Sequence, residues 1–196
     1  MSLVLASRSA SRRALLDGAG ILYDARPADI DEGVVKAREL LRGKTPAEIA
    51  LILAEEKALA CAASGDEFVI GADQVMEFDG ELYDKPVSLE EAGDRLFEMA
   101  GKIHYLRSGL VLAKGGEIIW RHRGSASLTM RKTSRDEIAS YLETVGERVL
   151  ATVGAYKLEG EGVRLFENIE GDYFTILGLP LMPLLAELRA REVLAW

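Results

Sequence analysis

A long apolar helix is the feature of this sequence that most constrains its fold. Residues 45–63 read TPAEIALILAEEKALACAA, with Thr45 at the N-cap, Pro46 at the first helical position and Glu48 three residues after the cap. An apolar run of strand length, FVIGA, follows at residues 68–72. Because apolar helices and strands in alternation cover each other's faces, the sequence predicts an α/β or α+β class around a mixed sheet.

The rest of the chain continues this alternation. Ser88 with Glu91 and Ser134 with Glu137 are capping-box pairs that open two further helices. The other predicted elements are strands over residues 3–6, 68–73, 103–113 and 117–130, a hairpin turn at residues 79–80, a helix from residue 10 and a C-terminal helix near residue 180. No repeat or linker interrupts the pattern, so we predict a single domain over residues 1–196.

The composition excludes several classes of protein. The chain has 32 acidic and 24 basic residues, and this net charge of -8 argues against general nucleic-acid binding. It has no apolar run of about 18 residues and no apolar signal-peptide core at its start, so we expect no membrane span and no signal peptide. A single cysteine cannot form an internal disulfide, which fits a reducing cytoplasm. Cys61 is the one cysteine, and His104 and His122 lack metal-ligand spacing. Acid–base chemistry is therefore expected to fall to carboxylates and a hard metal ion.

The segment LVLASRSASRR, residues 3–13, begins with an apolar run that is followed directly by three serines and three arginines. A strand, a short polar loop and a helix N-terminus form a cradle for an anion, in which Ser7 or Ser9 caps the helix or binds a phosphate. Arg12 and Arg13 add little to the helix from its first turn, because cations stabilise the opposite end. The alternative is a solvated basic patch.

Lys57 and Asp73 are the next candidates. Lys57 follows Ile49 and Leu53 at intervals of four residues, so it shares an apolar helix face, where it either extends to the surface or reaches a cleft and holds a phosphate. Asp73 ends the run FVIGA, where a carboxylate binds magnesium, takes a proton from water or simply makes a turn. Gln74 beside it is placed to read the edge of a base.

Two weaker signals lie on either side of these residues. Lys85 precedes Pro86, which restricts the lysine backbone to extended conformations and so fixes the direction of its side chain. Asp31 and Glu32 either share a cation with Asp73 or form an acidic cluster at a helix N-terminus.

The chain contains segments that follow one another in the order of a known family: LASRSASRRALL, EEKA, GADQV followed by DGELYDKP, GAYKLEGEG and EGDYFTILGLPL. Through these segments the chain resembles the Maf family of nucleoside triphosphate pyrophosphatases. The resemblance implies an elongated, two-lobed α/β fold related to the inosine triphosphate pyrophosphatases, with a mixed twisted sheet and a cleft between the lobes. It implies hydrolysis of a nucleoside triphosphate to the monophosphate and pyrophosphate with a divalent cation, Mg²⁺ before Mn²⁺. It also implies a cytoplasmic homodimer.

The family's functional residues transfer to matching positions of this chain. The resemblance makes Asp73 the general base, and Glu32 and Asp73 the residues that hold the metal. The positions implied to bind substrate are Ser7, Arg12, Lys57 and Lys85. The positions implied to select the base are Ser11, Gln74 and Glu159.

The specificity positions favour one branch of the family. Gln74 and Glu159 are similar to the branch that acts on 7-methyl-GTP rather than the branch that acts on dTTP and UTP. Ala10 and Ser11 depart from the usual proline and arginine of the first motif, and Ser11 matches neither branch.

Two other functions fit the same residues. One is a nucleotide-binding regulator of septum formation and cell division without significant turnover, although an intact set of Asp73, Lys57 and Lys85 favours turnover. The other is a phosphatase that releases orthophosphate.

Overall fold

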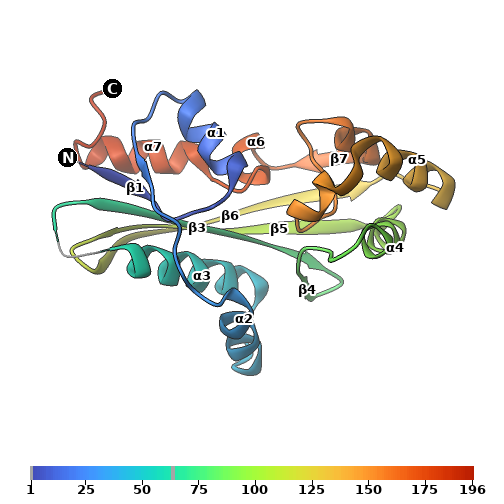
Figure 1. Cartoon of the computed structure of the whole chain (residues 1–196), viewed down its shortest axis with the longest axis horizontal. Helices are drawn as coiled ribbons and strands as arrows, with labels where there is room; N and C mark the ends of the chain where they lie inside the picture. The colour runs from blue at the N-terminus through green and yellow to red at the C-terminus, as the bar shows by residue number, and fades with distance from the viewer. Residues whose placement is uncertain (1, 63–64) are drawn as a thin grey trace. The chain divides into compact units, whose positions relative to one another are not determined.

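The computed structural model describes residues 2–62 and 65–196 as helices around one mixed sheet (Figure 1). The strands are β1 (Leu3–Leu5), β2 (Asp24–Ala25), β3 (Phe68–Phe78), β4 (Glu81–Tyr83), β5 (Ile103–Lys114), β6 (Glu117–Met130) and β7 (Phe166–Glu170). The α-helices are α1 (Ala10–Gly18), α2 (Glu32–Leu41), α3 (Pro46–Cys61), α4 (Leu89–Met99), α5 (Arg135–Val145), α6 (Tyr173–Ile176) and α7 (Leu181–Ala190). Two 3-10 helices span Gly146–Ala151 and Glu161–Leu165.

The sheet mixes parallel and antiparallel pairs, as the sequence predicts. Its seven described strands run in the order β2-β1-β3-β5-β6-β7, and β4 pairs with β3 outside this path. The strand β1 is parallel to both β2 and β3, whereas β3–β4 and β6–β7 are antiparallel. The α/β class is therefore confirmed.

The contacts of the chain divide it into two compact units. The first contains residues 1–74, 107–125 and 172–196, and the second contains residues 75–106 and 126–171. Within the described part of the chain, no helix is both long enough and apolar enough to cross a membrane.

The core of the first unit has a layer on each face of its strands. Because neighbouring side chains of a strand point to opposite faces, Leu3 and Leu5 of β1 pack with Leu16 of α1 and with residues of α7. Val4 packs on the other face with Ala54 and other small residues of α3. Figure 1 shows the same layers, with α1 and α7 on one side of β1 and β3 and α3 on the other.

Two glycines bring α3 directly against the sheet. A Cβ atom at Gly71 of β3 would lie 2.1 Å from the carbonyl oxygen of Ala54, and one at Gly109 of β5 would lie 2.2 Å from that of Ala50. Side chains at these positions would separate the helix from the strands. The close approach sets the position of Lys57, which lies about one turn after Ala54.

The predicted helix starts are confirmed, with one correction. Thr45 and Ser134 both form reciprocal capping boxes. Ser88 caps α4, but Glu91 accepts a hydrogen bond from the amide of Val87 instead of that of Ser88, so the predicted box does not form. The other carboxylate oxygen of Glu91 binds Arg95 at 2.7 Å, which accounts for its orientation.

Several predicted boundaries were wrong. The strand expected to end at Asp73 continues to residue 78 and turns at residues 79–80, where the predicted hairpin is confirmed. Asp73 therefore lies within a strand, three residues beyond Ile70, the last residue of β3 paired with β1. The first strand ends at Leu5, and Cys61 is the last residue of its helix. The predicted end of that helix at Ala63 lies outside the described residues.

Candidate active site

Lys57 joins two carboxylates in the first unit. Its Nζ atom lies 2.5 Å from Oδ1 of Asp73 and 2.7 Å from Oε1 of Glu32. The side chains of Lys57 and Asp73 are 9% and 6% exposed, whereas that of Glu32 is 46% exposed. The lysine therefore does not extend to the surface, and the three groups form a charged cluster that is open on the side of Glu32.

The two acidic residues at positions 31 and 32 have different roles, one at the helix N-terminus and one at the candidate site. Asp31 is the N-cap of α2 and accepts a hydrogen bond from the amide of Val34 at 3.0 Å. Glu32 is the first helical residue and binds Lys57. Asp31 thus has the structural role, and Glu32 has the contact with the candidate site.

Arg12 is buried and held at both ends of its guanidinium. Its Nε atom donates to the carbonyl oxygen of Gly178 at 2.7 Å, and Nη1 donates to Oγ of Ser7 at 3.1 Å. Ser9, rather than Ser7, is the N-cap of α1. The neighbouring Arg13 is exposed and binds the carbonyl oxygen of Arg8, so only Arg12 is enclosed by the fold.

Arg12 also lies close enough to the carboxylates of Asp73 and Glu32 for their charges to act on it. Burial lowers the pKa of Arg12, while the charges of Asp73 and Glu32 act in the opposite direction and raise it. Because a guanidinium starts from a pKa far above neutrality, Arg12 stays charged. Two cations, Arg12 and Lys57, are thereby set against two carboxylates, which we call the charge cluster (Arg12, Glu32, Lys57 and Asp73).

Gln74 is fixed by acceptors around its amide nitrogen. Nε2 donates to the carbonyl oxygen of Thr175 at 2.7 Å and to Oγ of Ser108 at 3.1 Å. Because these contacts need a donor, the nitrogen faces them and the amide oxygen of Gln74 is left as an acceptor. Ser11 is half-buried in the first turn of α1.

Residues of the segment GDYFTILGLP were missed as contributors to this region. Thr175 and Gly178 supply carbonyl oxygens to Gln74 and Arg12, and Gly178 does so from a positive φ of 95°. The available signal was the glycine after a short apolar run, which marks a backbone position that favours glycine. Ser108, in the middle of β5, carried no sequence signal.

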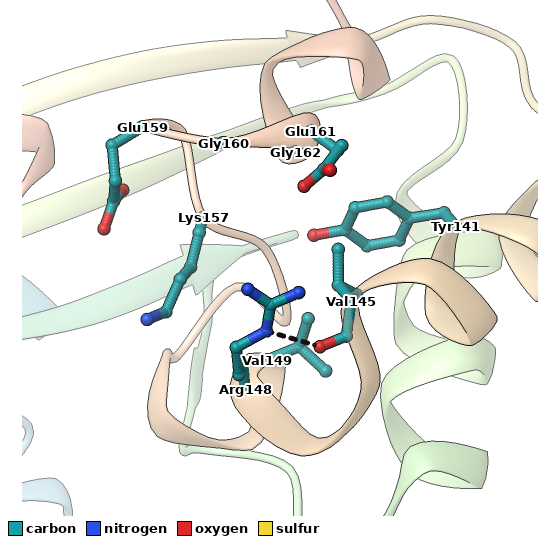
Figure 2. Close-up of a pocket in the computed structure, with 9 residues that line it drawn as sticks. All are labelled: Tyr141, Val145, Arg148, Val149, Lys157, Glu159, Gly160, Glu161 and Gly162. Carbon is teal, nitrogen blue, oxygen red and sulfur yellow. Dashed lines mark hydrogen bonds between the residues drawn. The ribbon is translucent and has the colours of Figure 1, made fainter.

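Lys85 and Glu159 belong to the second unit. Lys85 is exposed and lies just after β4. Glu159 is exposed and lines a pocket of about 230 Å³ (Figure 2). The pocket is lined by Tyr141, Val145, Arg148, Val149, Lys157, Glu159, Gly160, Glu161 and Gly162. Burial raises the pKa of Tyr141 to about 12, so its phenol stays protonated at neutral pH.

The donor set of the charge cluster fits a magnesium ion completed by a substrate. The described residues contain no group of three or more His, Cys, Asp or Glu side chains arranged to hold a metal. Glu32 and Asp73 nevertheless lie against the same ammonium group. Mg²⁺ in nucleotide enzymes commonly takes one or two carboxylates together with phosphate oxygens and water, so two carboxylates are sufficient protein ligands.

Comparison with known proteins connects this arrangement to one family. A family model described as Maf-like protein matches residues 2–191. A 7-methyl-GTP pyrophosphatase of Rhizobium etli is 48% identical over 188 residues, covering 95% of this chain and 94% of the relative. A 7-methyl-GTP pyrophosphatase of Brucella suis is 47% identical over 193 residues, covering 98% and 97%.

A third relative has a broader name. The nucleoside triphosphate pyrophosphatase of Gluconobacter oxydans is 46% identical over 196 residues, covering 99% of this chain and 97% of the relative. The matches extend over both units and include every position of the charge cluster within the residues that the family model spans. On this similarity along nearly its whole length, the chain belongs to the Maf family.

Proposed function

We propose that this chain hydrolyses 7-methyl-GTP to 7-methyl-GMP and pyrophosphate. As a member of the Maf family with relatives of that activity, the chain is a nucleoside triphosphate pyrophosphatase, a hydrolase of phosphoric anhydrides. The observation that carries the proposal is the contact of the buried Lys57 with both the buried Asp73 and the more exposed Glu32. This contact supports the proposal that a base, a cation and a metal-binding carboxylate act together on one reacting phosphate.

In this proposal Asp73 is the general base. Its carboxylate takes a proton from water as the water oxygen attacks the α-phosphorus, and the bond from that phosphorus to the bridging oxygen breaks, so that pyrophosphate leaves. Lys57 holds the carboxylate in place at 2.5 Å and compensates its charge between turnovers. When substrate is bound, the same ammonium is available to a phosphate oxygen.

Ser7 and Arg12 are proposed to bind the phosphate chain. Two bonds of Arg12, to Gly178 and Ser7, fix the plane of the guanidinium at the start of α1. Preorganised charged donors bind phosphate better than mobile surface cations, because little side-chain entropy is lost. Lys85 is proposed as a further cation that binds the triphosphate.

Glu32 and Asp73 are proposed to hold a divalent cation, Mg²⁺ in preference to Mn²⁺. A bound ion would neutralise phosphate charge and polarise the α-phosphate. The charge cluster supports the need for such an ion. Its two carboxylates already compensate its two cations, so a bound triphosphate adds negative charge that further cations must balance.

The proposed preference for a guanine nucleobase rests on the hydrogen-bond acceptors of the specificity residues. Gln74 presents its amide oxygen, since its nitrogen is occupied, and Glu159 presents a carboxylate. A guanine edge offers N–H donors to such acceptors, and methylation at N7 adds positive charge that a carboxylate attracts. Ser11 contributes a small side chain at the third specificity position.

Family membership supports three further parts of the proposal. We propose the two-lobed fold of the family, with a cleft that receives the nucleotide, for the single domain of residues 1–196. We also propose a homodimer and a cytoplasmic location. Size-exclusion chromatography with light scattering would measure the oligomer, and a monomer at micromolar concentration would reject that part.

The proposed activity is tested with a nucleotide panel. Purified protein with Mg²⁺ is mixed with 7-methyl-GTP, GTP, dTTP, UTP and other triphosphates, and pyrophosphate and orthophosphate are measured separately. We expect pyrophosphate, with the highest kcat/KM for 7-methyl-GTP. Orthophosphate as the product would indicate a phosphatase. Tight nucleotide binding without either product would favour the nucleotide-binding regulator.

A further inference from the structure

Arg95 is a buried arginine of α4 in the second unit that the proposed reaction does not use. It is 7% exposed, and its guanidinium lies over the ring of Tyr83, 5.2 Å from the centroid. Nη2 binds Oε1 of Glu91 at 2.7 Å, which compensates the charge. Arg95 is therefore enclosed and paired rather than solvated.

The remaining bonds of Arg95 go to two loop carbonyls. Nη1 donates to the carbonyl oxygen of Asp84 and, at 2.8 Å, to that of Val153. These carbonyls are 69 residues apart in the chain. That of Asp84 follows β4, and that of Val153 follows the 3-10 helix Gly146–Ala151. A single nitrogen thus ties together two segments without regular secondary structure.

Both segments lead to residues of the proposed site. Asp84 directly precedes Lys85, whose backbone is restricted on its other side by the buried Pro86. Val153 begins the stretch that leads through Tyr156 to Glu159. Arg95 therefore holds the backbone at Asp84, next to the proposed phosphate-binding Lys85. It also holds the backbone at Val153, six residues before the proposed base-selecting Glu159.

Stability alone is a poor explanation of this arrangement. The Nε–H of Arg95 is buried and has no hydrogen-bond partner among the residues that the structure describes. A buried charged group with an unpaired donor costs free energy that an apolar side chain of similar length avoids. The feature that an apolar side chain cannot reproduce is the pair of bonds to the loop carbonyls.

We propose that Arg95 is a positioning residue for the pyrophosphatase reaction, which holds Lys85 in the orientation that binds the triphosphate. The inference rests on the proposed function, because it assigns Lys85 to phosphate binding. Loss of Arg95 then weakens substrate binding through Lys85, while the proton transfer at Asp73 is unaffected. KM should rise and kcat should change little.

The test combines Arg95→Met and Arg95→Lys with Lys85→Met. With native Lys85, we expect Arg95→Met to raise KM about tenfold, equal to about 1.4 kcal/mol. Arg95→Lys should have a smaller effect, because the ammonium lacks the fork but keeps the charge and donors for a loop carbonyl. In the Lys85→Met background, the same changes should raise KM less than about twofold, since the lysine to be positioned is gone. Arg135→Met is the matched control, because Arg135 is an exposed arginine paired with Asp94.

Thermal unfolding of each variant separates folding from positioning, and kinetics are compared below the lowest transition. Arg95→Lys keeps the charge and provides the comparison if Arg95→Met does not fold. A full Arg95 effect in the Lys85→Met background would overturn the proposal, and so would an unchanged KM for Lys85→Met alone. Either result leaves pyrophosphate release by the native chain intact, whereas absence of that release would reject the proposed function itself.

Discussion

The ammonium of Lys57 lies 2.5 Å from a carboxylate oxygen of Asp73, and both side chains are less than a tenth exposed. Sixteen positions separate the two residues in the chain, and they come from a helix and a strand that meet through a glycine. A buried ion pair contributes little net stability, because desolvation offsets its attraction. The proposed function assigns this contact to chemistry at Asp73. Four predictions test that proposal and its structural basis, and a fifth concerns the effect of a buried histidine on stability.

Asp73→Asn should abolish most turnover. The amide keeps the shape of the carboxylate but cannot accept the proton from water, so kcat should fall by about 10²- to 10⁴-fold. Pyrophosphate release under saturating 7-methyl-GTP measures the change. Asp79→Asn, in the exposed hairpin turn, is the control and should retain native kcat. Retention of more than about a tenth of the activity by Asp73→Asn would exclude Asp73 as the base.

Glu32→Gln should weaken the binding of Mg²⁺ at the site. Replacement of one charged ligand should raise the Mg²⁺ concentration for half-maximal activity about tenfold or more. Titration of Mg²⁺ at fixed substrate gives this value. Asp31→Asn is a close control, because asparagine also caps a helix and Asp31 caps the start of α2 through the amide of Val34. Equal Mg²⁺ dependence of the two variants would rule out Glu32 as a ligand.

Arg12→Ala should raise KM for the triphosphate strongly. A charge-assisted hydrogen bond is worth about 1.5–3 kcal/mol, which corresponds to a KM increase of about ten- to a hundredfold. Steady-state kinetics of pyrophosphate release provide the measurement. Arg13→Ala changes the exposed neighbour and should leave KM within about twofold of the native value. If both variants behave alike, Arg12 does not bind the triphosphate and its buried bonds serve the fold alone.

Gly71→Ala should destabilise the protein by about 1–3 kcal/mol, because the added methyl group would overlap the carbonyl oxygen of Ala54 and push α3 from the sheet. Activity should fall as well, since α3 carries Lys57. Denaturant unfolding gives the free energy. Gly18→Ala, where nothing lies within 4 Å of the added atom, should change stability by less than about 1 kcal/mol. Equal stabilities would show that α3 does not require this glycine.

His104 should make the fold sensitive to mild acid. Burial lowers the pKa of His104 from 6.5 to about 4, so between these values the unfolded chain binds a proton that the folded chain does not. Stability must then fall as the pH drops, by about 2 kcal/mol between pH 7 and pH 5. Urea unfolding at the two pH values should show this decrease, and His104→Gln should remove most of it.

The second histidine provides the control for that experiment. His122 is less buried than His104, and the variant His122→Gln still contains His104. This variant should therefore retain most of the loss of stability between pH 7 and pH 5. A native protein equally stable at both pH values would show that His104 is protonated in the fold as readily as outside it.

Much of the local structure could be predicted from short-range chemistry. The caps at Thr45, Ser88 and Ser134 and the hairpin at residues 79–80 depend on neighbours within a few positions, so the sequence contains all the information they need. The Maf resemblance also comes from residue order alone, and the family model supports it. The roles of the individual site residues stay predictions.

Other features depended on partners that the local pattern does not contain. The apolar pattern predicts a strand end at Asp73 because a charged residue usually interrupts an apolar run, whereas here Lys57 compensates that charge inside the sheet. The spacing predicts a capping box for Glu91, but its carboxylate binds Val87 and Arg95 instead. At Asp73 a tertiary contact decided the outcome, whereas Glu91 has two local partners other than the one expected.

The sequence by itself determined the class of fold, the helix starts and the family, because propensity, capping and motif order act within a short stretch of chain. Only the tertiary structure decided that Lys57 is buried against Asp73 rather than extended to solvent, that Arg12 and not Arg13 is enclosed, and that Gln74 presents its oxygen. These outcomes depend on which distant donors, acceptors and charges share a space from which water is excluded. Packing brings those groups together, and an unpaired charge or amide in such a space is too costly to remain.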